Sequence, residues 1–155
     1  MNILIENQQT RHTLSESMIW ETAGCILRAL DLPDAQLSIL IVDDDRIAEL
    51  NETYLNHQGP TNVISFPMRE GLFADITPEL LGDVVISADT AFSEARDAEM
   101  AFITRFNELL VHGILHLVGY DHVHSEEEAK VMEEKAQWLM TLIEKADTHE
   151  SGHRR

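Results

Sequence analysis

Apolar positions in the first 87 residues of the chain come mostly in short runs, whereas later ones recur at helical spacing almost to the end. Short apolar runs rich in Ile, Leu and Val predict strands, and apolar residues three and four apart predict helices. The predicted strands cover residues 2–6, 37–42, 63–66 and 83–87. The predicted helices cover about 13–30, 43–55, 88–98, 101–118 and 125–145.

This order of elements predicts an α+β domain, with a small mixed β-sheet packed against about five helices. No repeat, linker or second domain interrupts the pattern, so residues 1–146 are expected to form a single domain. Residues 147–155 are polar and are expected to form a disordered tail.

Two helix starts carry a capping signal. Thr13 precedes Glu16 by three residues, and Ser125 precedes Glu128 by the same spacing. Such pairs predict that each hydroxyl caps the first turn of a helix. Trp20 is expected to pack on or beside the apolar face of the first helix.

Composition narrows the class of protein. The chain has 155 residues, 44% of them hydrophobic, and a formal net charge of −17. That charge disfavours non-specific binding to nucleic acid, including DNA, or to an anionic membrane, because both require basic surface. Cys25 is the only cysteine, which excludes an intrachain disulfide and a cysteine-rich metal site. Without a signal peptide or membrane-span pattern, we expect a soluble, cytoplasmic protein.

The segment HGILHLVGYDH, residues 112–122, carries the clearest chemistry. His112 and His116 are four residues apart, so on a helix they point only about 40° away from each other. Gly119 is placed to end that helix, and the reversal can bring His122 to the same point. Three neutral imidazoles suit Zn²⁺ and leave a fourth position for water or substrate. A histidine pair alone could also be satisfied by hydrogen bonds in a core, and the third histidine is what favours a metal.

The histidine and glycine spacing equals that of the metzincin protease motif H-E-x-x-H-x-x-G-x-x-H. Gly113, however, stands where those proteases carry the glutamate that activates water. A peptidase of that type would lack its general base. Asp121 adjoins the third histidine and could orient one of the ligands.

The same segment resembles the YbeY family of bacterial rRNA maturation endoribonucleases, whose hallmark is H-G-x-L-H-L-x-G-Y-D-H. PTNVISFP, residues 60–67, and LGDVVIS, residues 81–87, are similar to two further segments of that family. The similarity covers about residues 37–127 in register.

The resemblance implies a zincin-related α+β fold with one Zn²⁺ per chain, bound by His112, His116 and His122. It also implies metal-dependent cleavage of single-stranded RNA, with a role in 16S rRNA 3′-end maturation and ribosome quality control. The ribosome or ribosome-associated proteins would be partners.

The chain departs from the family pattern at Leu55, where relatives usually carry an arginine after the tyrosine of an N-x-x-Y-R segment. Leucine cannot donate a hydrogen bond to a phosphate. Arg69 and His57 are the nearest candidates in sequence for that role, and solvated surface side chains are the alternative for both.

For cleavage of a phosphodiester, zinc would act as a Lewis acid or make water easier to deprotonate. Asp121, His57 or the 2′-hydroxyl of the RNA could take up the proton. Two other functions remain open, a non-catalytic ribosome-assembly factor with a structural zinc and a zinc hydrolase of another substrate. Since the chain is so acidic, we expect a partner to deliver the RNA.

Overall fold

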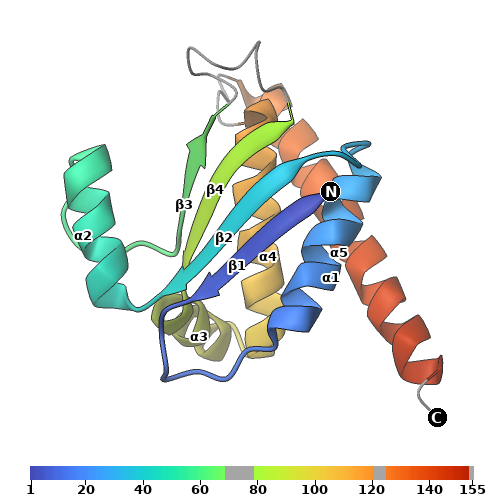
Figure 1. Ribbon diagram of the computed structural model, residues 1–155, viewed down its shortest axis with the longest axis horizontal. Coiled ribbons are helices and arrows are strands. Elements are labelled where there is room, and N and C mark those ends of the chain that lie inside the picture. The colour runs from blue at the N-terminus through green and yellow to red at the C-terminus, as the bar shows by residue number, and fades with distance from the viewer. Residues whose placement is uncertain (69–78, 121–124, 154–155) are drawn as a thin grey trace.

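Three parallel strands and one antiparallel strand form the central sheet of the computed structural model (Figure 1), which describes residues 1–68, 79–120 and 125–153. The strands are β1 (Asn2–Asn7), β2 (Gln36–Val42), β3 (Val63–Pro67) and β4 (Leu80–Ser87). Their order across the sheet is β1-β2-β4-β3. β1, β2 and β4 run parallel, and β3 pairs with β4 in the antiparallel sense at one edge. The predicted small mixed sheet is therefore confirmed.

In the described part of the chain, five α-helices and one π-helical turn pack around this sheet. They are α1 (Glu16–Ala29), α2 (Asp44–Leu55), α3 (Ala88–Asp97), α4 (Phe102–Leu115), η1 (His116–Tyr120) and α5 (Glu126–His153). All five predicted helices are present, so the α+β class is confirmed. No helix among the described residues is long and apolar enough to cross a membrane.

The main core lies between one face of the sheet and α1, α4 and α5. It includes Ile26 of α1, Ile39 of β2, Ile86 of β4 and Ile114 of α4, all fully buried. Neighbouring residues of a strand point to opposite faces, so Val85 belongs to a second, smaller core beneath α2. Helices therefore pack on both faces of the sheet.

The start of α1 differs from the prediction. The N-cap is Ser15, whose hydroxyl accepts a hydrogen bond from the backbone N–H of Met18. Thr13 precedes the helix in a loop where the Gln9 side chain hydrogen-bonds both backbone groups of His12. The capping-box prediction at Thr13 was therefore wrong.

At α5, by contrast, the capping prediction is confirmed, because the Ser125 hydroxyl accepts a hydrogen bond from the backbone N–H of Glu128 at 3.1 Å. The expected packing of Trp20 on or beside the apolar face of α1 was wrong, since Trp20 is 45% exposed and is not among the residues packed against the core. Ile19 is fully buried on α1, and the next residue is turned about 100° away from that face.

The end of α4 is shaped by Gly119. The helix passes into the π-helical turn η1, and the chain kinks at Gly119, which has a φ of 113°. Only glycine adopts such a conformation readily, so the predicted role of Gly119 in ending the helix is confirmed. At the other end of the chain, α5 continues to His153, into the segment 147–155 expected to form a tail.

Candidate functional site

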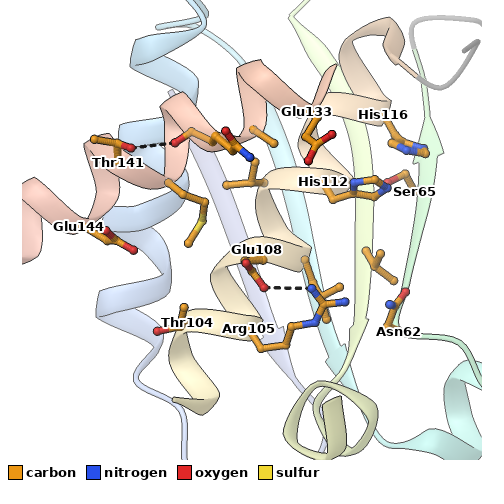
Figure 2. A pocket seen from close by; sticks show the side chains of 16 residues that line it. Asn62, Ser65, Thr104, Arg105, Glu108, His112, His116, Glu133, Thr141 and Glu144 are labelled. Atoms are coloured by element: carbon orange, nitrogen blue, oxygen red, sulfur yellow. Dashed lines mark hydrogen bonds and ion pairs between the residues drawn. The ribbon is translucent and has the colours of Figure 1, made fainter. Parts of the chain in front are cut away.

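One face of α4 forms the floor of an open cleft of about 800 Å³ (Figure 2). Residues of β3 and of the segment just before it form one wall, and α5 forms the other. The lining residues are Asn62, Val63, Ser65, Thr104, Arg105, Glu108, Leu109, Val111, His112, His116, Glu133, Ala136, Gln137, Met140, Thr141 and Glu144. Arg105, Glu108, His112 and His116 share the floor because intervals of three and four residues place side chains on one helix face.

His112 and His116 lie together at one end of this floor. Their ring centroids are 4.5 Å apart, and the ring planes are tilted by 43°. Burial lowers the pKa of His112, and the nearby His116 and Arg105 lower it further. The neutral imidazole, which is the form that binds a metal ion, is therefore favoured at His112.

The donor chemistry of this pair fits zinc, since both side chains offer imidazole nitrogen from consecutive turns of one helix. Three other predicted site residues, Arg69, Asp121 and His122, lie outside the described residues. Within the described ranges, no group of three His, Cys, Asp or Glu side chains is arranged to hold a metal ion. The third ligand thus stays a prediction.

Arg105 occupies the cleft floor two turns before His112. Its guanidinium donates hydrogen bonds to Glu94 at 3.1 Å and to Glu108 at 3.0 Å. Burial alone would lower the pKa of Arg105, but the two carboxylates outweigh it and raise the pKa above its usual value. Arg105 is therefore held as a cation in a fixed position inside the cleft.

The charge of the cleft is nonetheless negative. Glu108, Glu133 and Glu144 line it, against Arg105 as the one Lys or Arg side chain among the described lining residues. A polyanion entering the cleft therefore needs a cation in addition to Arg105. A divalent ion at the histidine pair would supply that charge.

Gly113 faces away from the cleft and packs against the sheet. A Cβ atom at this position would lie 2.7 Å from Cγ1 of Val84 and 3.2 Å from Cγ2 of Val63. The Ser65 hydroxyl also donates a hydrogen bond to the Gly113 carbonyl oxygen at 2.8 Å. Because Gly113 directly follows His112, this close contact holds the histidine pair in a defined position along β3 and β4.

Comparison with known proteins identifies the family of this chain. The family model described as Endoribonuclease YbeY matches residues 4–144. The chain belongs to the YbeY family. It is 48% identical over 145 residues to the Endoribonuclease YbeY of Geobacter sulfurreducens, covering 93% of this chain and 97% of that relative. Identity to the Geobacter metallireducens protein of the same name is 45% over 146 residues, covering 94% and 97%.

A solved structure supports the fold alone. The solution structure of a Thermotoga maritima protein matches with a TM-score of 0.66 at 24% sequence identity. The match covers 91% of this chain and 88% of that protein.

Two positions named from the YbeY resemblance do not line the cleft. Leu55 ends α2 and is 43% exposed. His57 follows in an exposed loop, where its backbone N–H donates to the carbonyl of Asn51. The structure thus does not bring His57 to the histidine pair, because the left-handed turn at Asn56 ends the helix and the loop stays at the surface.

Sequence reasoning missed Arg105 and Glu133. For Arg105 a signal was present, because residues 105, 108, 112 and 116 recur at helical intervals that place them on the histidine face. For Glu133 there was none, since only the packing of α5 beside α4 brings it to the cleft.

Proposed function

We propose that this chain is a zinc-dependent, single-strand-specific endoribonuclease that acts in 16S rRNA 3′-end maturation and ribosome quality control. The observation that carries the proposal is the pair of adjacent imidazoles, 4.5 Å apart, at one end of an open cleft in a YbeY family member. Relatives of similar length carry the name endoribonuclease, which supports RNA as the substrate.

In this proposal His112 and His116 hold one Zn²⁺ together with His122. When bound, zinc supplies Lewis acidity, which polarises a phosphoryl oxygen and makes water easier to deprotonate. Arg105 lies along the same floor and is placed to face a neighbouring phosphate of the RNA. Its ion pairs to Glu94 and Glu108 orient the guanidinium before any substrate arrives.

The open cleft favours single-stranded RNA, because the hydrolysed phosphate has to reach a histidine pair seated between α5 and β3. The net charge of −17 and the carboxylates of the cleft oppose long-range attraction to RNA. We therefore propose that the ribosome or an associated protein presents the substrate.

The decisive experiment combines metal analysis with an RNA cleavage assay. We expect one zinc per chain in the purified protein, cleavage of single-stranded RNA that stops on chelation, and recovery when zinc is restored. His116→Ala should lose both zinc and cleavage. His149→Ala, a histidine change in the C-terminal segment, is the matched control and should keep both.

The alternatives give different results in the same experiment. A non-catalytic assembly factor would retain zinc but cleave neither naked RNA nor ribosomal precursors. A hydrolase of another substrate would spare RNA and act in a panel of peptides and nucleotides. Cleavage of RNA by fully metal-free protein would remove zinc from the mechanism.

A further inference from the structure

The position that supplies the general base in metzincins is closed in this fold. A side chain at Gly113 would collide with Val84, so that face of α4 is occupied by the sheet. Residues 112 and 113 are also about 100° apart around the helix, which directs them to different sides. Position 113 therefore offers no proton acceptor to the histidine end of the cleft, and a carboxylate for that role has to be sought at another position.

The α5 wall offers a carboxylate at that end. Glu133 is exposed, lines the cleft and reaches from α5 toward His112 and His116 (Figure 2). Glu108, on the floor, is already paired with Arg105. Glu144 lies toward the opposite end of the cleft (Figure 2).

The arrangement also separates Glu133 from the ligand set. Among the residues that the structure places, Glu133 does not join the two histidines in a group able to hold a metal ion. A carboxylate beside the ligands but not among them leaves room for a water molecule between itself and the reacting phosphate. That is the position from which a general base works, through a hydrogen bond to the attacking water.

We propose that Glu133 is the general base of the reaction, an inference that rests on the proposed function. A water molecule in the cleft loses a proton to the Glu133 carboxylate while its oxygen forms a bond to phosphorus. The bond from phosphorus to the departing ribose oxygen breaks, its electron pair stays on that oxygen, and a proton from solvent completes the new hydroxyl. Glu133 then releases its proton to solvent.

The test compares Glu133→Gln with Glu134→Gln. Both changes remove one negative charge from the exposed surface of α5, but Glu134 lies with Val131, Lys135 and Trp138 away from the cleft. Each variant is assayed for cleavage of single-stranded RNA, for zinc per chain, and for binding of an RNA whose scissile phosphate is replaced by a non-hydrolysable linkage. Circular dichroism and the melting temperature report folding.

We expect Glu133→Gln to lower kcat by about 100-fold or more. Its zinc content should equal that of the wild type, and its RNA affinity should be unchanged or higher, because a negative charge has left the cleft. The kcat of Glu133→Asp should lie between those of the wild type and Glu133→Gln. The kcat of Glu134→Gln should equal that of the wild type.

Three results would overturn the inference. Wild-type kcat in Glu133→Gln would show that another group accepts the proton. The proposed nuclease function would still stand in that case. Loss of zinc in Glu133→Gln would make Glu133 a ligand. Failure of the zinc-loaded wild-type protein to cleave any RNA would overturn the proposed function and the inference together.

Discussion

The Ser65 hydroxyl donates a hydrogen bond to the backbone carbonyl of Gly113 at 2.8 Å, which joins β3 to α4 one residue after His112. In an α-helix such a carbonyl normally accepts a hydrogen bond from a backbone N–H of the same helix. The bond from Ser65 is an additional one that comes from the sheet. It is possible because Gly113 lets the helix approach closely. The Gly113 side of α4 is thus packed against the sheet, whereas the side that carries His112 and His116 faces the cleft.

Gly113→Ala should destabilise the fold. Its new Cβ would lie 2.7 Å from Cγ1 of Val84, and overpacking of this kind should lower the free energy of unfolding by about 1 to 2 kcal/mol, even after the better helix propensity of alanine. Gly24→Ala is the control, because its Cβ would meet only the flexible side-chain ends of Arg28 and Met1, and the change should be neutral or stabilising. Denaturant unfolding measures both.

The contact itself can be isolated by a double-mutant cycle. In a Val84→Ala background, Gly113→Ala should cost less than in the wild type, since the colliding methyl group is gone. Equal costs in the two backgrounds would show that the helix does not approach β4 as closely as described.

Arg105→Gln should weaken binding of single-stranded RNA. The change leaves Glu108, Glu133 and Glu144 in the cleft with no Lys or Arg side chain among its described lining residues. The slope of log K against log salt should also fall by about 0.7 for one lost phosphate contact. Arg96→Gln removes an exposed arginine outside the cleft and should preserve the slope. Filter binding over a salt series measures both slopes. Equal slopes for the two variants would show that Arg105 does not contact a phosphate of the RNA.

Asp89 should make stability depend on pH. Burial acts to raise the pKa of Asp89, but the backbone N–H of Asp44, then His12 and Arg11, outweigh it and hold the pKa below its usual 3.8. A carboxylate with a lowered pKa in the folded state stabilises the fold above the unfolded pKa, and this contribution is lost as the pH falls through the folded pKa.

Asp89→Asn is therefore expected to lower the free energy of unfolding by about 1 to 3 kcal/mol at pH 7. The gap to the wild type should begin to close below about pH 4, where the unfolded chain takes up the proton, and should be lost as the pH falls through the lower folded pKa of Asp89. Urea titrations at a series of pH values measure this, and a gap independent of pH would argue against an ionised Asp89 as its cause.

Ser15→Ala and Thr13→Ala distinguish the observed cap from the predicted one. Ser15→Ala removes the hydroxyl that accepts from the N–H of Met18 and should cost about 1 kcal/mol of stability. Thr13 is exposed in the preceding loop, so Thr13→Ala should change stability by no more than about 0.5 kcal/mol. The reverse order of costs would restore the capping box at Thr13.

Local patterns predicted the elements and the Ser125 cap of α5 well, but they placed the cap of α1 at the wrong residue. Strand and helix types follow from the period of apolar residues, which a window of the sequence contains. The choice between Thr13 and Ser15 depends on Gln9, whose hydrogen bonds to His12 hold the loop. Trp20 was misplaced for a similar reason, because the face of α1 that is buried is set by its neighbours rather than by hydrophobicity alone.

In the site, too, some features follow from the local sequence and others from the packing of distant elements. The spacing of four residues between His112 and His116 determined, by helix geometry alone, that two imidazoles would meet on one face. The glycine at 119 likewise determined where the helix ends, since few other residues adopt its positive φ. These are local properties of a backbone with fixed rise and rotation.

Only the tertiary structure decided which other side chains accompany the pair. Arg105 shares its helix, but its fixed place depends on Glu94 from α3, and Glu133 reaches the cleft because α5 packs beside α4. The sequence places Glu133 more than twenty residues from His112, and no local rule links the two. Contacts between elements are set by how apolar faces pack in three dimensions, which is why His57, two residues after Leu55, lies outside the cleft.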